Sequence, residues 1–397
     1  MVTHNYIKKK IVWNKKNKKT FNFNLPSKNK IKILHLTRFF KTSSLGGIER
    51  GIINSNTNCD KYNIQNDILT TTNDNDDYQL FEGMHVYYAK QTLDIQNNII
   101  SIDFINKFNK IKHNYDYINI HYPWPFADLV AALFATKKNK IILNYHADIV
   151  KSSFLKKVYY IFLKYFKNKI YFINISSKTY LSNSNCKNLF PNSKVFIQVP
   201  GYKSSLINNE NIRGSIKKLF KDKKKFIFFI GKLRHYKGTD KLIKLIENNR
   251  DLNFIIFNNS VDLFLKLKKK ENVNFFFNTN DDEKFFVFKN SYLHIFPSDN
   301  KAESFGLTLL EAQLFGCPSI VYNIGTGVNE IVINNFNGIT IQNLNDSFDI
   351  VIRKLINDKD YRNKLSKNTE ITKNKFSVDN YQSYYNYVKE LYEKKIL

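Results

Sequence analysis

Two glutamates stand out in a chain that is otherwise strongly basic. Glu303 and Glu311 are separated by seven residues within segment 296–327, which is poor in lysine and rich in glycine. A predicted helix begins near Gly306 and ends before Gly316, so Glu303 precedes it and Glu311 lies inside it. The free N–H groups and the dipole at the start of such a helix attract anions, most often phosphate. The two carboxylates are then placed to hold sugar hydroxyl groups on either side of a diphosphate.

Each glutamate also has a simpler explanation. Glu303 can be an N-terminal capping acid and Glu311 a surface residue, and for either one alone this explanation is the better one. The pair together with the glycines favours a binding site, where Gly306 lets the backbone approach a ligand and Thr308 adds a hydroxyl.

Segment 229–246, "FIGKLRHYKGTDKLIKLI", supplies cations. Lys232 follows a predicted strand directly, and Lys237 precedes Gly238 at the start of the next predicted helix. Lysines in so basic a chain are usually surface charge. Ligands of parallel sheets bind at the carboxyl ends of the strands, and this position favours a role in holding a diphosphate.

The elements that must position these residues alternate between strand and helix. Apolar runs at 31–37, 115–122 and 140–146 are each followed by helix-compatible sequence, and the alternation restarts at residue 225 after a polar stretch, 203–225, that we interpret as a linker. This predicts an α/β fold with two Rossmann-like domains. The expected boundaries are a flexible basic tail at 1–30, domains at 31–203 and 204–375, and a terminal helix at 376–397.

Two motifs resemble a known family. "GKLRHYKG" and "ESFGLTLLEAQLFGCP" are similar to the motifs of the group 1 (Glu-x7-Glu) retaining glycosyltransferases of GT-B fold, and the resemblance extends over about residues 31–390. It implies two Rossmann-like domains facing a central cleft, with the C-terminal helix crossing back to the first domain. It also implies that Glu303 contacts the donor sugar and Glu311 the ribose, and that the donor diphosphate is bound by Gly46, Gly47, Lys232, Lys237, Gly306, Leu307 and Thr308. Lys232 replaces the family's usual arginine, which keeps the charge but loses the bidentate fork.

The first half of the chain carries looser similarities. "NYHADIV" resembles a family segment whose histidine lies beside the donor sugar, which implies that role for His146 and makes Asp148 a structural or acceptor-side neighbour. In "IHYPWPFADL", His121 and Trp124 are expected on a loop after a strand. There they either line an acceptor site or pack the domain. The layout resembles bacterial mannosyl- and rhamnosyltransferases of lipid-linked polysaccharide synthesis.

The predicted partners follow from charge and from the family. The net charge of +28 and the pI of about 9.7 indicate anionic partners, although the abundance of Lys, Asn and Ile reflects codon bias in part. A basic, aromatic helix within 152–170 and the basic tail are candidates for contact with an anionic membrane, and a core-facing helix is the alternative. Nucleic acid is not expected as a partner, because the lysines are dispersed and the known binding motifs are lacking.

The resemblance therefore predicts a metal-independent, retaining hexosyltransferase without a cofactor, with His146, Glu303 and Lys237 as its catalytic residues. It implies transfer of mannose from GDP-mannose to a saccharide or lipid-linked acceptor in the cytoplasm, with the inner face of the membrane as the alternative location. A UDP-hexose donor, a sugar-nucleotide epimerase, a transferase that only binds nucleotide sugars and a basic nucleic-acid-binding protein are the alternatives. "DND" at 74–76 resembles a metal-binding motif of another fold, but its polar surroundings indicate a loop.

Overall fold

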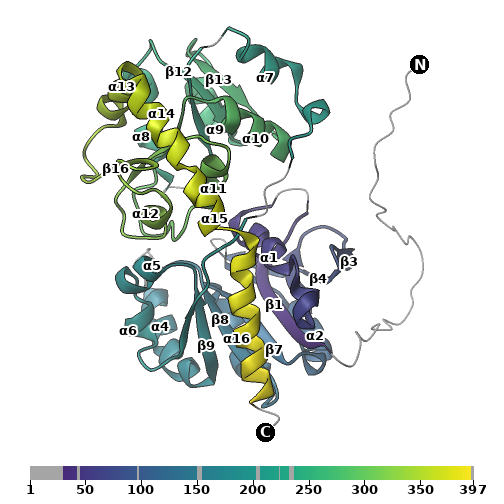
Figure 1. Cartoon of the computed structure of the whole chain (residues 1–397). Coiled ribbons are helices and arrows are strands. Elements are labelled where there is room, and N and C mark those ends of the chain that lie inside the picture. The colour runs from purple at the N-terminus through teal and green to yellow at the C-terminus, as the bar shows by residue number, and fades with distance from the viewer. Residues whose placement is uncertain are drawn as a thin grey trace.

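A computed structural model describes residues 30–42, 45–95, 98–149, 154–202, 206–222, 224–231 and 237–394 of the chain. Residues 1–29 of the predicted basic tail and the predicted diphosphate ligand Lys232 lie outside the described residues. The described chain forms two α/β domains that face one another, as the resemblance implies (Figure 1).

The first domain is built on an eight-stranded sheet with the order β10-β9-β8-β7-β1-β2-β4-β3. Its neighbouring strands pair in parallel except β3 and β4, which form an antiparallel hairpin. All six residues of β7 are buried, as expected for a parallel strand covered on both faces. The strands are β1 (Ile31–Phe39), β2 (Ile64–Thr72), β3 (Tyr78–Phe81), β4 (Met84–Lys90), β7 (Tyr117–Tyr122), β8 (Lys140–Tyr145), β9 (Ile170–Ile175) and β10 (Val195–Ile197).

The second domain is built on a six-stranded, fully parallel sheet with the order β13-β12-β11-β14-β15-β16. The chain moves outward from β11 to one edge and then returns to β14 on the other side. Parallel sheets of this type bind ligands at the point where the strand order reverses, here between β11 and β14. The strands are β11 (Phe226–Ile230), β12 (Asn253–Phe257), β13 (Val273–Phe276), β14 (Leu293–Phe296), β15 (Ser319–Tyr322) and β16 (Gly338–Ile341).

Helices cover both sheets. In the first domain they are α1 (Gly47–Asn56), α2 (Ile102–Ile111), α3 (Pro125–Phe134), α4 (Phe154–Phe166), α5 (Lys178–Asn183) and α6 (Cys186–Leu189). The later helices are α7 (Gly214–Leu219), α8 (Thr239–Asn248), α9 (Val261–Leu267), α10 (Asp281–Asn290), α11 (Leu307–Leu314), α12 (Val328–Ile331), α13 (Phe348–Asn357), α14 (Lys359–Asn368), α15 (Glu370–Lys375) and α16 (Tyr381–Glu393). Within the described residues, none of these helices is long and apolar enough to cross a membrane.

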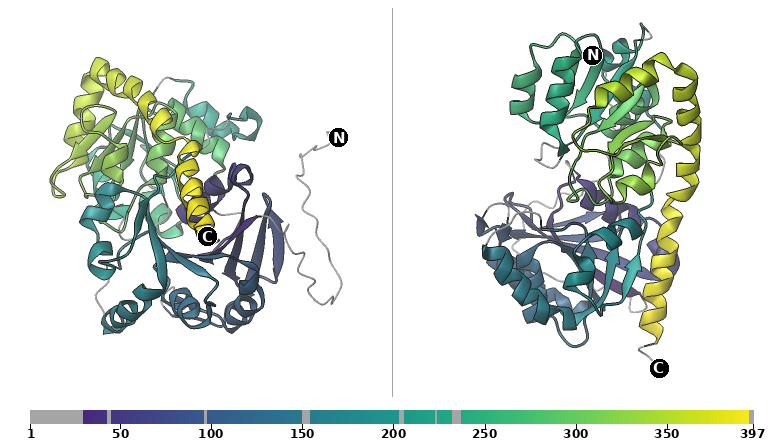
Figure 2. Two further views of the ribbon diagram at one scale, coloured as in Figure 1. Left: turned by 60° about the horizontal axis from the view of Figure 1, so that its bottom comes forward. Right: turned by 90° about the vertical axis from the view of Figure 1, so that its left-hand side faces the viewer.

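The last helix returns to the first domain, as predicted. Tyr384 and Tyr385 of α16 are buried in one cluster with Ile33, Tyr117 and Phe172 of the first sheet. Figure 2 shows α16 running from the second domain along the first. The chain thus passes between the domains twice, and the two passages are in contact: a Cβ on Gly201 would lie only 2.3 Å from the carbonyl oxygen of Ser377.

The interpretation of 203–225 as a linker is wrong for part of its length. Helix α7 occupies Gly214–Leu219, and Ile212 and Ile216 are buried in the core of the second domain. Ile216 is the buried residue of this short helix, and Ile212 enters the same core from the segment just before it. So short a signal is lost among the surrounding lysines and asparagines.

Candidate active site

The loop between β14 and α11 carries the first of the two glutamates. Gly306 is the N-cap of α11 and has a φ of 87°, in the left-handed region that favours glycine. A Cβ at this position would also lie 2.9 Å from the side chain of Leu309. The helix N-terminus therefore begins where the sequence predicts it, with Leu307 and Thr308 in its first turn and Gly316, φ 77°, after its end.

Lys237 and Glu303 meet at this loop. The Lys237 ammonium donates to a carboxylate oxygen of Glu303, and both side chains are largely buried, with 19% and 11% of their surface exposed. The same ammonium lies 5.1 Å from the centre of the Phe296 ring. Two residues from separate predicted motifs thus form one ion pair at the carboxyl ends of neighbouring strands.

Gly238 brings Lys237 to this position. It has a φ of 65°, and a Cβ there would lie 1.8 Å from the carbonyl oxygen of Pro297. The start of α8 can therefore lie directly on the end of β14 only because this residue lacks a side chain. Lys237 and Gly238 therefore work together: the glycine lets the start of α8 approach the end of β14, and the lysine supplies the positive charge there.

The first domain brings a second helix N-terminus to the same place. Gly46 is the N-cap of α1, and a Cβ on Gly47 would lie 3.9 Å from Leu307 in the first turn of α11. Residues 46–47 and 306–307 therefore face each other across the domain boundary. The starts of two helices, where the first N–H groups have no partner within the helix, therefore lie close together.

Glu311 lies deeper and is already paired. It is 1% exposed, and its Oε1 lies 2.6 Å from the ammonium of Lys284 on α10. Lys284 also contacts Asp281 at 3.0 Å, and Asp281 binds both terminal nitrogens of Arg50 from α1 at 2.8 and 2.9 Å. The predicted ribose ligand therefore belongs to a charged network that links the two domains.

A second set of contacts joins the domains on the other side. The carboxylate of Glu330 accepts from Ser177 Oγ at 2.8 Å and from the Thr179 backbone N–H at 2.7 Å, at the start of α5. The Asn183 amide donates to the Gly325 carbonyl at 3.1 Å. These contacts tie the glycine-rich turn after β15 to the first domain.

His146 follows β8 and belongs to a buried row of polar side chains. Its Nε2 lies 2.7 Å from Nδ1 of His121, whose Nε2 lies 3.0 Å from Nδ1 of His35. Burial lowers the pKa of His35 and of His146 to about 4 and holds the pKa of His121 well below its usual value, with a further contribution from the two neighbouring rings. The three imidazoles are therefore neutral at pH 7.

The sequence placed the acceptor-side candidate His121 wrongly, whereas Trp124 does lie between β7 and α3. His121 lies inside β7 and is 6% exposed, so it supports His146 from behind and does not lie on a loop. Trp124 is 1% exposed, packs edge-on against Phe104 and donates its indole N–H to the Ile99 carbonyl. A side chain so enclosed cannot line an acceptor site, so the packing alternative holds for Trp124.

Asp148 has a structural place. Its carboxylate accepts from the hydroxyl of Tyr145 and from the Asn185 backbone N–H, and its own N–H donates to Tyr180 Oη at 2.7 Å. These bonds fasten the loop after β8, which carries His146, to α5 and α6. Asp148 therefore holds in place the loop that carries His146.

The Asp-Asn-Asp segment at 74–76 lies in the exposed turn between β2 and β3, where Asp74 pairs with Lys41. Within the described ranges, no group of three or more histidine, cysteine, aspartate or glutamate side chains is arranged to hold a metal ion.

The chain matches known proteins over both domains. Residues 211–372 match the family described as "Glycosyl transferases group 1". The O-antigen chain mannosyltransferase C of Escherichia coli is 28% identical over 347 residues, which cover 85% of this chain and 92% of that protein. The D-rhamnosyltransferase WbpZ of Pseudomonas aeruginosa is 27% identical over 322 residues, 78% of this chain and 82% of that protein.

Solved structures share the fold at low identity. Anabaena Alr3699/HepE, crystallised with UDP and glucose, superimposes with a TM-score of 0.69 and 15% identity over 91% of this chain and all of the other. Sucrose-phosphate synthase of Thermosynechococcus elongatus gives a TM-score of 0.71 at 15% identity, over 92% and 99% of the two chains. Residues 211–372, in the second domain, therefore match the group 1 glycosyltransferases, and the two-domain architecture is the GT-B fold.

Proposed function

We propose that this protein is a retaining hexosyltransferase that moves mannose from GDP-mannose to a saccharide or lipid-linked saccharide during the synthesis of a surface polysaccharide. The observation that carries the proposal is the Lys237–Glu303 pair beside the start of α11, facing residues 46–47 of the first domain. A cation, two helix N-termini and a carboxylate that can accept from sugar hydroxyls form a set of groups suited to a sugar diphosphate.

The choice of sugar rests on the relatives. The E. coli relative is named as a mannosyltransferase of O-antigen chains and the P. aeruginosa relative as a D-rhamnosyltransferase, and both are covered over four fifths of their length or more. A D-rhamnose or UDP-hexose donor is the nearest alternative. A thermal-shift panel of nucleotide sugars decides between them, because binding stabilises the folded state in proportion to the logarithm of the ligand concentration over Kd.

In the proposed reaction the bond between the anomeric carbon and the diphosphate oxygen breaks. The acceptor oxygen bonds to the same face of that carbon, and its proton passes to the departing phosphate. Lys237 and the N–H groups at the start of α11 neutralise the negative charge that grows on the phosphate. Glu303 and His146 orient the sugar through its hydroxyl groups. An NMR assignment of the product's anomeric configuration tests retention, and an inverted product would exclude this route.

We propose that the reaction needs no divalent metal, since the ammonium group and the helix N-termini supply the positive charge. Transfer at an unchanged rate in EDTA is the expected result. Loss of transfer in EDTA, followed by recovery on addition of Mg²⁺ or Mn²⁺, would show that a metal carries this task.

The alternatives of other classes are separated by product analysis. An epimerase would convert a nucleotide sugar that is supplied without any acceptor. A protein that only binds nucleotide sugars would give a thermal shift but no product. A nucleic-acid-binding protein would show strongly salt-dependent affinity for arbitrary DNA and no response to nucleotide sugars.

We also propose that α3 and α4 contact an anionic membrane surface. The apolar side chains of α4 lie on two sides: Leu163 and Phe166 are buried, whereas Val158, Ile161 and Tyr165 are 49%, 56% and 76% exposed. Exposed Leu129 and Leu133 on α3, together with exposed Lys157 and Lys164 on α4, complete a mixed apolar and basic surface. Cosedimentation with vesicles containing anionic lipid is expected and should weaken in Tyr165→Glu.

A further inference from the structure

A line of hydrogen bonds runs through the first sheet behind His146. It crosses from β8 to β7, β1 and β2, passing from His146 to His121 at 2.7 Å, to His35 at 3.0 Å and to Asn66 at 3.2 Å. It then reaches Asn56 at the end of α1, 3.2 Å from Asn66. His35, His121 and Asn66 are 4%, 6% and 2% exposed, so water does not compete for these bonds.

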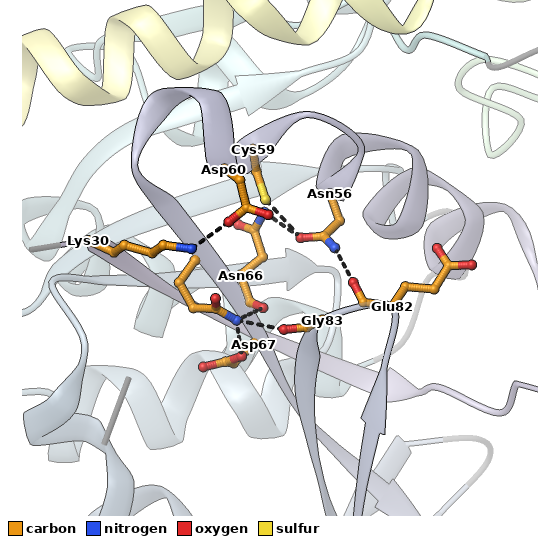
Figure 3. A network of polar contacts seen from close by, with 9 residues as sticks. Lys30, Asn56, Cys59, Asp60, Asn66, Asp67, Glu82 and Gly83 are labelled. Carbon is orange, nitrogen blue, oxygen red and sulfur yellow. Dashed lines mark hydrogen bonds and ion pairs between the residues drawn. The ribbon is translucent and has the colours of Figure 1, made fainter. Parts of the chain in front are cut away.

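The line has a fixed direction because it ends on a main-chain carbonyl. The Asn56 side-chain amide nitrogen lies 2.9 Å from the carbonyl oxygen of Glu82, which can only accept a hydrogen bond. The Oδ1 of Asn56 must therefore face Asn66 and accept from its Nδ2. Asn66 is left with Oδ1 toward His35 and must accept from His35 Nε2–H. Figure 3 shows this anchored end, with Asn56 between the Glu82 carbonyl, Cys59 and Asn66.

The direction carries through the imidazoles. A neutral imidazole has one N–H and one lone pair, so a proton on His35 Nε2 leaves Nδ1 to accept from His121 Nε2–H. His121 Nδ1 then accepts from His146 Nε2–H. The burial of these rings keeps them neutral at pH 7 and so maintains this alternation.

A second branch has the same polarity. Asn119 Nδ2 lies 3.4 Å from His35 Nδ1, while its Oδ1 accepts from Asn144 Nδ2 at 2.9 Å. Asn144 Oδ1 in turn accepts from Asn174 Nδ2 at 2.7 Å. A proton on His35 Nδ1 would oppose the Asn119 amide, so this branch also requires the lone pair there.

We propose that His121 and His35 are positioning residues that hold His146 in the Nε2–H tautomer, so that His146 Nδ1 accepts a hydrogen bond from one hydroxyl group of the donor sugar. The tautomer follows from the contacts between the buried, neutral rings and from the anchored amide of Asn56. The contact with the sugar rests on the proposed function. The lone pair of His146 Nδ1 can then bind a hydroxyl group, which donates a hydrogen bond. It cannot bind a phosphate oxygen, which has no proton to donate.

The direct test is the nitrogen NMR spectrum of the full-length chain labelled with ¹⁵N-histidine, recorded without ligand near neutral pH. Long-range nitrogen–proton correlations distinguish the two neutral tautomers, and His146→Gln identifies the signals of His146. The expected spectrum has a protonated Nε2 and an unprotonated Nδ1. A proton on Nδ1, or a rapidly exchanging mixture in the unsubstituted protein, would overturn the proposal without any variant being needed.

Variants at His121 then test positioning. His121→Leu removes the acceptor, so His146 should become a mixture of tautomers and kcat for transfer from GDP-mannose should fall about tenfold, the equivalent of one net hydrogen bond. His121→Gln retains an acceptor and a donor and should restore both the spectrum and the rate. His85→Gln, a histidine on β4 outside the line, is the matched control and should leave the His146 signals unchanged.

Three outcomes separate the claims. An unchanged Nε2–H pattern in His121→Leu would overturn the positioning role. An equal loss of kcat in His121→Leu and His121→Gln, with only the second keeping the tautomer, would overturn the contact with the sugar. The expected tautomers without turnover of any nucleotide sugar would support the positioning role and refute the proposed function.

Discussion

The two domains bring opposite chemistry to their shared boundary. The second domain presents charge on loops: Lys237 and Glu303 meet after β11 and β14, beside the start of α11. The first domain presents a neutral row within its strands, ending at His146. The charged half suits a diphosphate whose charge changes during reaction, and the neutral half suits hydroxyl groups that need only be oriented. The proposed transfer reaction requires both kinds of group.

The largest expected difference in the free energy of unfolding is between substitution of Glu311 and substitution of Glu303. Glu311 and Lys284 are 1% and 4% exposed, so Glu311→Gln breaks a buried pair and should lower the free energy of unfolding by about 3 kcal/mol, the low end of the usual range because Asp281 remains beside Lys284. Glu303→Gln, in a pair that is less deeply buried, should cost less, about 1–2 kcal/mol, between the values for exposed and buried pairs. Urea unfolding of both variants measures the difference. Equal losses would mean that Glu303 is as structural as Glu311.

Lys237→Ala should have the largest effect on catalysis. Removing one preorganised donor to the leaving phosphate typically lowers the rate about 10²–10³-fold. Lys244, exposed on helix α8 that follows Lys237, supplies the control: Lys244→Ala should leave kcat unchanged. Steady-state transfer assays of the two variants decide. A Lys237→Ala enzyme within tenfold of the wild type would remove the leaving-group role.

Acid should lower the free energy of unfolding through the buried, neutral histidines of the first domain. The pKa of His35 is lowered to about 4 when folded, below its unfolded value, so its contribution is present above the unfolded pKa and is lost as pH falls toward 4. The loss is about 1.4 kcal/mol per pH unit, or roughly 2 kcal/mol at about pH 5. Asp128 acts in the opposite direction, because burial raises its pKa to about 7 and its contribution is lost as pH rises from its unfolded value to 7.

Two variants separate these opposing groups. His35→Gln lacks the imidazole whose protonation destabilises the wild type in acid. Its free energy of unfolding should therefore fall less than that of the wild type over the same pH range. Asp128→Asn should do the reverse and make the acid loss steeper. Denaturant unfolding at a series of pH values gives both slopes. A steeper acid loss in His35→Gln would contradict a neutral His35.

The smallest expected effects compare two glycines. Gly238→Ala places a Cβ against the Pro297 carbonyl in a left-handed backbone and should destabilise the protein by about 1–2 kcal/mol from backbone strain alone, with lower transfer as the loop shifts. Gly51 lies inside α1 with nothing within 4 Å of an added Cβ. Gly51→Ala should therefore stabilise by about 0.5–1 kcal/mol. Thermal unfolding that ranks the two variants in the opposite order would refute this account of the Lys-Gly turn.

The sequence predicted the two halves of the site unequally. The site residues of the second domain are close to one another in the sequence. Their glutamates, glycines and lysine have fixed spacings around two strand ends, and this pattern predicts a helix start without knowledge of the fold. The polar row of the first domain is not local. His35, Asn66 and His121 lie in three strands and His146 directly follows a fourth. Only the order β8-β7-β1-β2 makes them neighbours. Each looks like a lone polar residue in an apolar strand, and that pattern alone was the available signal.

The errors have a physical cause of the same kind. His121 and Trp124 were expected on a loop after an apolar strand, where they would either line an acceptor site or pack the domain. The sequence does not tell which side of the turn faces the core, and Trp124 is the largest fully buried side chain. Tertiary packing also determines the structure of residues 214–219, where Ile216 holds a short helix against the core of the second domain.

The central claim is that Lys237 and the start of α11 bind the diphosphate of a nucleotide sugar. Isothermal titration of GDP-mannose into the wild type and into Lys237→Ala, with EDTA present, tests it most directly. The account predicts measurable binding to the wild type and a Kd at least tenfold higher for Lys237→Ala, from the loss of one charge-assisted hydrogen bond. Equal affinity of the two proteins would contradict it.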